Sequence, residues 1–143
     1  MNINDKPHII DMMETFYNSE AVLTNGSREI FENDINACLS DSPYLEGYTL
    51  KEEDKIIGYF MLAKSFSTEY GKPCIWVEDI YLIKEYRYQG LSKEMFKFIE
   101  DKYPNHLLRL EAEKSNESAI KSYKKNGFEI MDYLELYKNN NGN

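Results

Sequence analysis

The sequence contains little of what marks a secreted, membrane-spanning or disulfide-bonded protein. Cys38 and Cys74 are its only cysteines. They lie far apart in apolar surroundings, so we expect both thiols to be reduced. The longest apolar run, IIGYFMLA at residues 56–63, is far too short to cross a bilayer. The first residues, MNINDKPHII, lack the basic start and long apolar stretch of a signal peptide. These absences predict a cytoplasmic protein with no membrane partner.

Positive charge is also scarce. The chain has 17 Lys and Arg residues against 25 Asp and Glu residues, which gives a formal net charge of −8. Nucleic-acid binding relies on basic surface that meets phosphates, so we expect no nucleic-acid partner. An acidic chain suits a cationic small molecule, although most acidic proteins are simply soluble.

Familiar catalytic and metal-binding sets are missing as well. His8, His106 and the two cysteines show no metal-ligand spacing, and no Ser/His/Asp or Cys/His set is apparent. We therefore expect no metal ion.

The patterns that are present predict one α/β (α+β) domain. A chain of 143 residues can bury a proper core. We assign residues 1–138 to this domain and expect residues 139–143, NNNGN, to be a disordered tail. Apolar spacing predicts helices at 9–17 and, with Ser27 as N-cap, from there to about Leu39. Residues 48–64 form a hairpin around the polar turn at 52–55. Next we expect a strand at 74–83, a helix at 92–103, a short strand at 107–113, a helix at 116–126 and two short strands in 128–138 that close the sheet.

The strand WVEDIYL, residues 76–82, carries two adjacent acids, Glu78 and Asp79, within an apolar run. In a regular strand Trp76, Glu78, Ile80 and Leu82 would share one face, and Val77, Asp79, Tyr81 and Ile83 the other. An uncompensated carboxylate in a buried strand costs several kcal/mol. Each acid therefore needs a partner or a function, unless the strand frays or bulges here and both acids reach solvent. The pattern alone leaves these alternatives open.

A glycine turn follows in RYQGLSKEMF, where Gly90 stands between a strand and a helix. The first amide groups of such a helix lack internal partners and can bind phosphate or pyrophosphate, with Arg87 and Lys93 adding positive charge. A single glycine at such a turn usually means only a turn. The glycines of a Walker A loop or a GxGxxG motif are absent.

A third pattern, NESAIKSYKKNGF, sets Asn116, Ala119 and Tyr123 at helical spacing ahead of Gly127. Ser115 or Asn116 would cap this helix. A tyrosine on an amphipathic helix is usually a core residue, so this pattern alone does not predict a function.

The order of the three patterns resembles the Gcn5-related N-acetyltransferases, the GNAT superfamily. The resemblance covers essentially the whole chain and is strongest from Trp76 to Phe128, and the segment VEDIYL is similar to the diamine (polyamine) acetyltransferase branch. The family signature Gln/Arg-x-x-Gly-x-Gly/Ala falls on Arg87, Gly90 and Ser92, with serine where Gly or Ala is usual. The resemblance implies a mixed, mostly antiparallel twisted sheet flanked by about four helices. The first strand of the family is almost absent from this sequence.

The resemblance also implies roles for single residues. The central strand would bulge near the acids, and Glu78, with Asp79, would meet the incoming amine. Tyr123 would protonate the departing thiolate, since an ordinary tyrosine, with a pKa of about 10, holds its proton at neutral pH. The implied acetyl-CoA-binding residues are Ile80, Tyr81, Leu82, Arg87, Tyr88, Gln89, Gly90, Leu91, Ser92, Lys93, Asn116 and Ala119.

We therefore expect an acetyl-CoA-dependent N-acetyltransferase that acts directly on a primary amine, with a small cationic amine as acceptor. The alternatives are acetylation of a protein N-terminus or lysine, a non-catalytic acyl-CoA-binding or regulatory module, and a nucleotide-binding protein. Retention of both Glu78 and Tyr123 argues against a pure binding module. The sequence leaves a homodimer open.

Overall fold

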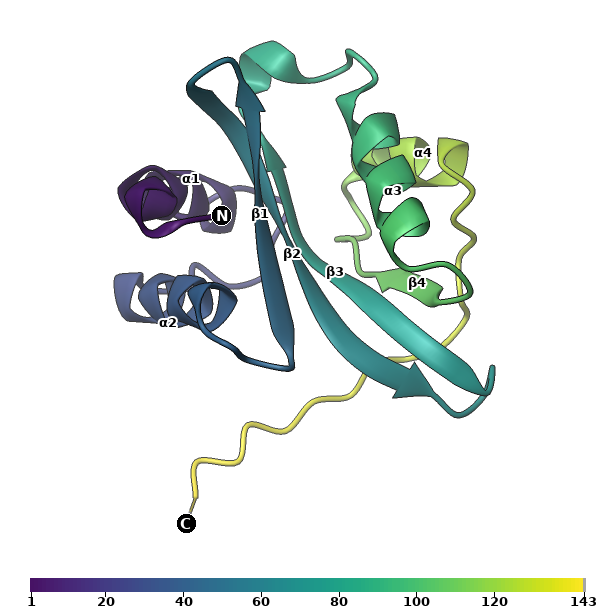
Figure 1. Ribbon diagram of the computed structural model, residues 1–143. Helices are drawn as coiled ribbons and strands as arrows, with labels where there is room; N and C mark the ends of the chain where they lie inside the picture. Colours follow the sequence, from purple (N-terminus) through teal and green to yellow (C-terminus); the bar gives the residue numbers. More distant parts are fainter. Residues whose placement is uncertain (143) are drawn as a thin grey trace.

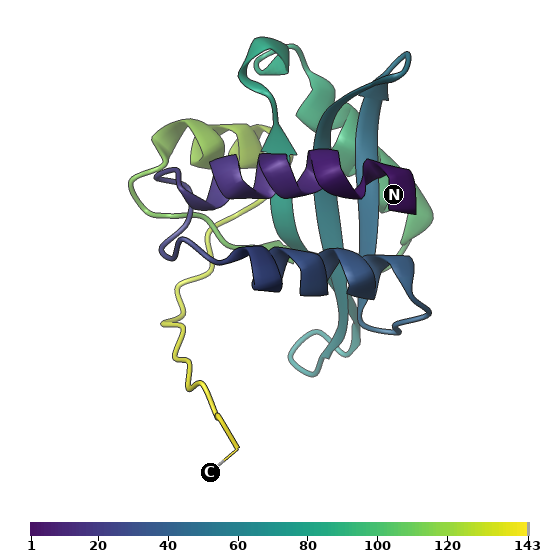
Figure 2. The same ribbon diagram turned by 90° about the vertical axis from the view of Figure 1, so that its left-hand side faces the viewer.

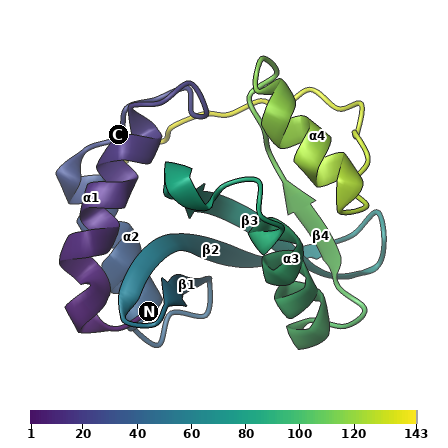
Figure 3. The same cartoon turned by 90° about the horizontal axis from the view of Figure 1, so that it is seen from above.

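The computed structural model describes residues 1–142, in which one sheet lies between two layers of helices (Figure 1). The elements are η1 (Ile3–Asp5), α1 (Lys6–Tyr17), α2 (Arg28–Leu39), β1 (Leu45–Glu52), β2 (Lys55–Ser67), β3 (Lys72–Leu82), η2 (Lys84–Tyr86), α3 (Leu91–Lys102), β4 (Leu107–Leu110) and α4 (Glu117–Lys125). Helices α1 and α2 lie side by side across one face of the sheet (Figure 2), and α3 and α4 lie on the other side (Figure 3).

The strand order is β1-β2-β3-β4. The pairs β1–β2 and β2–β3 are antiparallel, and β3–β4 is parallel. This confirms the expected mixed, mostly antiparallel sheet with four helices. Within residues 1–142 no strand precedes α1, in agreement with the expected loss of the first strand.

Local signals set the ends of the helices. The Ser27 side chain accepts a hydrogen bond from the amide of Ile30 at 3.2 Å and caps α2 as expected. Asn116, and not Ser115, caps α4, because its side chain accepts from the amide of Ala119 at 3.4 Å. Both choices follow from the need of the first helical amides for an acceptor.

Two hydrophobic clusters fill the space on the two faces of the sheet. The cluster under α1 and α2 contains Ile9, Ile10, Met13, Phe31, Ile35, Tyr59 and Met61. The cluster under α3 contains Phe60, Leu62, Ile75, Val77, Met95, Phe96 and Ile99. Neighbouring residues of β2 contribute to opposite clusters, as the pleat of a strand requires. Both cysteines are free, with Cys74 buried and Cys38 half-buried.

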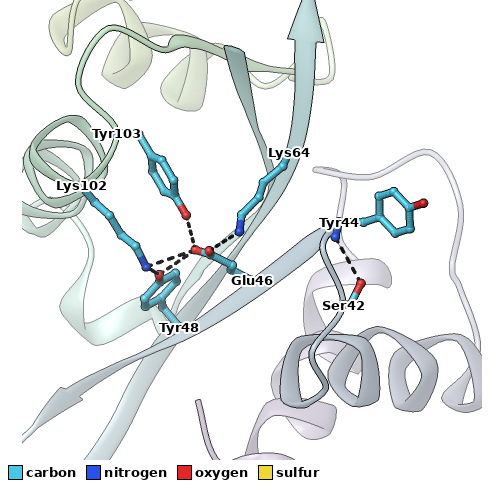
Figure 4. Close-up of polar contacts among 7 residues, drawn as sticks. All are labelled: Ser42, Tyr44, Glu46, Tyr48, Lys64, Lys102 and Tyr103. Carbon is cyan, nitrogen blue, oxygen red and sulfur yellow. Dashed lines mark hydrogen bonds and ion pairs between the residues drawn. The ribbon is translucent and has the colours of Figure 1, made fainter.

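A polar network around Glu46 of β1 ties the sheet to the end of α3 (Figure 4). Glu46 pairs with Lys64 at 2.6 Å and with Lys102 at 3.3 Å. The hydroxyls of Tyr103 and Tyr48 donate to the same carboxylate at 2.5 and 2.8 Å. Burial alone would raise the pKa of Glu46, but these partners lower it to about 2. The network thus holds an ionised carboxylate between β1, β2 and α3.

The two strands predicted in residues 128–138 do not form. After Phe128 none of the backbone hydrogen bonds joins this segment to the sheet, and β4 is the last strand within residues 1–142. The segment runs past β4 and away from the domain (Figure 1). Alternating apolar residues describe a tendency to form a strand, but a strand also needs a neighbour that supplies its hydrogen bonds. The last residue of the expected tail, 143, lies outside the described residues, and 139–142 form no helix or strand.

Candidate active site

The pairing of β2 with β3 shifts at Glu78. Met61 pairs with Asp79, while its neighbour Leu62 pairs with Val77. One step along β2 therefore corresponds to two steps along β3, and Glu78 is left without a partner. Such an extra residue is a β-bulge, which re-aims the side chains around it. The bulge that the resemblance implied is present in the structure.

The bulge corrects the regular alternation expected for this strand. Val77 is buried in the cluster under α3, whereas Asp79, two positions later, contacts α1. In a regular strand these two side chains would share a face. After the bulge, Ile80 packs on the α3 side and Tyr81 on the α1 side. The extra residue therefore places Asp79 on the α1 side and shifts the alternation of the residues after it by one position.

Asp79 is 5% exposed and is held by two tyrosines. The Tyr17 hydroxyl donates to Oδ1 and the Tyr59 hydroxyl donates to Oδ2, each at 3.0 Å. Burial raises the pKa of Asp79, and the two hydrogen bonds oppose that rise. The pKa remains raised on balance, while the two donor hydroxyls favour the ionised form of the carboxyl group, whose oxygens only accept. The structure places this predicted substrate-binding residue in the interior.

Glu78 is the accessible member of the pair, with an exposed side chain. Partial loss of hydration nevertheless raises its pKa, and the negative charges of Asp79 and Glu135 raise it further. A carboxylate with a raised pKa that still meets solvent is suited to accept a proton from an incoming group.

Beyond the bulge, one edge of β3 is free. The strand β4 pairs only with Cys74–Val77. The predicted cofactor-binding residues Ile80, Tyr81 and Leu82 therefore have β2 on one side and, within residues 1–142, no strand on the other. A free edge offers backbone N–H and C=O groups to an extended ligand. The side chain of Arg87 lies at the end of this edge, where its Nε donates to the carbonyl oxygen of Leu82 at 2.8 Å.

The predicted turn at Gly90 leaves the first amide groups of α3 without a capping side chain. Gly90 has φ 79° and is the N-cap of α3, where it supplies no capping side chain. A Cβ placed on Gly90 would meet no atom within 4 Å, so the space above the turn is open. Tyr88 has φ 63° and is 90% exposed. Left-handed residues just ahead of a helix turn successive N–H groups toward one concavity, which favours an anion.

The remaining side chains of the turn face different ways. Leu91 and Ser92 form the half-buried first turn of α3, and Lys93 is exposed. Gln89 points back into its own loop, where Nε2 donates to the carbonyl oxygen of Glu85 at 2.9 Å. Ser92 lies beside α4, with its hydroxyl oxygen 3.5 Å from that of Ser122. Ser92, which departs from the family signature, therefore lies next to another serine, and the space above the Gly90 turn remains open.

Helix α4 brings Tyr123 to the same side of the sheet. Its ring packs edge-on against Phe96 at 6.1 Å and near Phe128 at 6.2 Å. Burial raises the pKa of Tyr123, so the phenol keeps its proton at neutral pH. The amide of Ala119 donates a hydrogen bond to the side chain of Asn116 at the N-cap of this helix. The cap interaction gives Asn116 a structural role in addition to the predicted one.

A hollow of about 320 Å³ lies between β4, α4 and residues 128–135. Its lining includes Trp76, Glu111, Tyr123, Phe128, Tyr133 and Glu135. Glu111 was not predicted from the sequence. Its burial and the nearby Glu135 and Glu78 raise its pKa to about 7. The position of Glu111 directly after the apolar residues of β4, in LLRLEAE, is the signal that could have indicated it.

Asp34 of α2 is a second acid that the sequence analysis missed. It is half-buried, and burial, followed by the charges of Asp79 and Glu78, raises its pKa to about 6. Asp34 lies three positions after Phe31 and one before Ile35, within the apolar stripe of its helix. An acid in such a stripe is the available signal.

The mixed sheet with its free β3 edge, followed by a glycine turn into α3, has the architecture of an N-acetyltransferase domain. The model of the acetyltransferase (GNAT) family matches residues 9–128, and the chain belongs to this family. Comparison with curated protein sequences gives no match.

Solved structures share the fold at low sequence identity. A possible acetyltransferase from Clostridium difficile 630 is 21% identical, with a TM-score of 0.79 over 95% of this chain and 91% of that one. The aminoglycoside N-acetyltransferase AAC(6')-Iy, solved with a bisubstrate analogue of CoA, is 15% identical, with a TM-score of 0.75 over 98% and 95%. A ribosomal-protein-alanine N-acetyltransferase from Brucella melitensis biovar Abortus 2308 is also 15% identical, with a TM-score of 0.75 over 97% and 94%.

The residues present suit an acyl-CoA molecule. The free edge of Ile80–Leu82 can bond an extended amide-bearing arm, and the open turn at Gly90 can seat a pyrophosphate. Among residues 1–142 no group of three or more His, Cys, Asp or Glu side chains is placed to hold a metal ion. None of the helices in this part of the chain is long and apolar enough to cross a membrane.

Proposed function

We propose that the protein is an acetyl-CoA-dependent N-acetyltransferase that moves an acetyl group directly to a primary amine, without a covalent acyl-enzyme. The observation that carries this proposal is the bulge at Glu78, which sets an accessible carboxylate beside the free edge of Ile80–Leu82. A module that only binds acyl-CoA needs the edge and the Gly90 turn but no accessible acid at the bulge.

The proposed acceptor is a small cationic amine. Glu78, Asp34 and Glu111 are close enough that Glu78 raises the pKa of the other two. Several carboxylates that meet one region attract an ammonium group by charge. Acetylation of a protein N-terminus or lysine is the second candidate, and the similarity to the ribosomal-protein-alanine N-acetyltransferase favours its inclusion in any test.

The proposed roles follow the position of each group. Glu78 attracts the ammonium and takes its proton, directly or through water, so that the amine can attack. The bound acetyl-CoA supplies the thioester carbonyl that the amine attacks. Backbone amides near Asp79 and Ile80 polarise that carbonyl. Tyr123 gives its phenolic proton to the leaving sulfur.

The proposed binding residues divide into two groups. Ile80, Tyr81 and Leu82 hold the pantetheine arm through backbone hydrogen bonds. The pyrophosphate is held by residues 87–93, whose backbone amides and two exposed cations, Arg87 and Lys93, surround the open turn. Asn116 and Ala119 approach the cofactor from α4.

The proposal is tested by incubating the protein with acetyl-CoA and a panel of amines while free thiol is detected. The panel contains diamines, polyamines, aminoglycosides, lysine analogues and peptides with a free N-terminus. We expect thiol release that depends on a small amine with at least one further positive charge. Tight CoA binding without amine-dependent release across the whole panel would contradict catalysis and support the binding module.

We also propose a cytoplasmic homodimer. Ile130, Met131, Tyr133, Leu134, Leu136 and Tyr137 are all exposed large apolar residues. Ile130, Met131 and Tyr133 line hollows beside β4, whose outer edge has no partner within residues 1–142. Contiguous exposed apolar surface next to a free strand edge favours association with a second copy.

A further inference from the structure

Asp79 is the most deeply buried acid next to the proposed catalytic carboxylate, and the roles proposed above leave its side chain without a function. Its two oxygens are bound by tyrosines from different elements, Tyr17 at the end of α1 and Tyr59 in β2. Tyr17 lies 62 positions away from Asp79 in the sequence. The three residues therefore join α1, β2 and β3 at the position where the bulge begins.

This contact fixes the bulge. A bulge leaves one residue outside the ladder, and the strand could relieve it by moving the extra residue elsewhere along β3. A slip toward the C-terminal end of β3 would swing Asp79 away from both hydroxyls and leave polar groups buried without partners. A slip toward the N-terminal end would move Val77 from its place opposite Leu62 in the cluster under α3. Asp79 on one side and the buried Val77 on the other therefore determine that Glu78 is the extra residue.

The anchored side chain also carries a charge. The two donor hydroxyls favour the ionised form of Asp79, which is the residue next to Glu78 in the chain. Nearby carboxylates repel each other, and the charge of Asp79 raises the pKa of the accessible Glu78. Among the other charged groups, Glu135 from the C-terminal segment raises the pKa of Glu78, while Glu111 after β4, Asp34 on α2 and Tyr17 on α1 are close enough to sense the charge of Glu78.

We propose that Asp79, held by Tyr17 and Tyr59, is a positioning residue that fixes Glu78 as the bulge residue and, through its charge, makes Glu78 a stronger base. This inference rests on the proposed function for its catalytic meaning. It also explains why two acids stand together in WVEDIYL: one meets the substrate, and the other is buried to set the position and basicity of the first.

The first test is a carboxyl titration by NMR of the protein labelled with ¹³C in Glu side chains, with the Glu78 signal assigned from its loss in Glu78→Gln. In Asp79→Asn, which keeps the shape and removes the charge, we expect the Glu78 midpoint to fall by about 0.5 to 1 pH unit. An unchanged midpoint in a folded Asp79→Asn protein overturns the inference. Asp34→Asn is the matched control, and we expect a smaller shift because the pKa of Glu78 is raised by burial, Asp79 and Glu135.

If Asp79→Asn does not fold, Tyr17→Phe carries the same test. It removes one of the two donors that favour ionised Asp79, so Asp79 becomes neutral earlier as the pH falls. The Glu78 midpoint should then fall as well, by a smaller amount. Tyr103→Phe, which removes a hydroxyl from the distant carboxylate of Glu46, is the control and should leave the midpoint unchanged.

The second test is the pH profile of kcat/KM for the best amine. We expect the acidic limb to move to lower pH in Asp79→Asn, with kcat reduced because a weaker base removes the proton. An acidic limb at its wild-type position in an active Asp79→Asn enzyme also overturns the inference. Failure of the proposed function is distinguishable, because the wild-type protein would then show no amine-dependent turnover while the NMR titration still reports the coupling.

Discussion

Tyr123 meets Phe96 edge-on, with 6.1 Å between ring centroids, while no hydrogen bond of its hydroxyl is found within residues 1–142. Every buried side-chain N or O atom in this part of the chain has a partner, so the Tyr123 hydroxyl reaches solvent. The ring is thus held by packing and the phenol is left free. A residue held in this way can lose its hydroxyl without losing its place.

Tyr123→Phe should therefore separate catalysis from stability. We expect kcat to fall by about 10²-fold or more, because general-acid contributions run to roughly 10²–10⁴. The melting temperature should hardly change, since the ring contacts remain. Steady-state kinetics and thermal melts measure the two effects. Near-normal turnover with a lowered melting temperature would show that Tyr123 is only structural.

Gly90→Val should weaken acetyl-CoA binding. The branched side chain would enter the open space above the turn, where the pyrophosphate is proposed to lie. The positive φ of 79° adds strain to any residue with a Cβ. We expect at least a tenfold loss of affinity in calorimetry, since a few lost amide contacts are worth 1.4 kcal/mol or more.

Gly71→Val is the matched control for the strain. Gly71 has φ 65° and also has no atom within 4 Å of the Cβ position, but it lies in the turn between β2 and β3. Both variants should lose similar stability, and only Gly90→Val should lose affinity. Unchanged binding in a folded Gly90→Val protein would place the pyrophosphate elsewhere.

Glu78→Gln should raise the KM for the amine and lower kcat, because one carboxylate both attracts the ammonium and accepts its proton. Acetyl-CoA affinity should change little, since backbone groups of Ile80–Leu82 bind the arm. The loss in kcat should be about 10²-fold. Glu100→Gln, at an exposed position on α3, serves as the control and should behave as the wild type. Wild-type KM and kcat in Glu78→Gln would remove the argument for a cationic acceptor.

Glu46 should make stability depend on pH in the acid range. Its pKa in the folded protein is about 2, below its usual value of 4.5. A lowered folded-state pKa contributes stability that is present above about pH 4.5 and is lost as the pH falls toward 2. Denaturant unfolding between pH 7 and pH 2 should show this loss, and Glu46→Gln should remove it. At pH 7 we expect Glu46→Gln to cost about 1.5 to 3 kcal/mol, the usual contribution of hydrogen bonds to a charged group.

The C-terminal segment should control association. Leu134 and Leu136 are 87% and 92% exposed in the single chain. If a second copy covers them, the double variant Leu134→Glu, Leu136→Glu should be a monomer, with little change in the unfolding of the domain itself. Light scattering coupled to size exclusion measures the mass. Leu23→Glu is the control, because Leu23 is 86% exposed between α1 and α2, and it should leave the mass unchanged. A monomeric wild-type protein would contradict the proposed dimer.

Features with local causes were predictable from the sequence. The cap at Ser27, the helix that ends before Pro104 and the turn at Gly90 depend on a few neighbouring residues, and all three occur as expected. The family resemblance added the bulge, which local alternation alone would have missed.

The anchoring of Asp79 by Tyr17 could not be predicted, because it joins residues 62 positions apart and depends on how α1 crosses the sheet. Asp34 and Glu111 escaped notice for the same reason, since their raised pKa values come from acids on other elements. The strands predicted in 128–138 failed because the sequence cannot show whether a neighbouring strand is available.

The bulge at Glu78 has a consequence for any redesign of this strand. Up to Val77, odd-numbered residues point toward α3, and from Ile80 onward even-numbered residues do. The two halves of β3 are thus out of phase by one residue. Deletion of Glu78 would remove the bulge together with the carboxylate, because Val77 would be followed directly by Asp79 and a single alternation would hold with Asp79, Ile80 and Tyr81 on their present faces. In this strand the number of residues carries as much structural information as their identity.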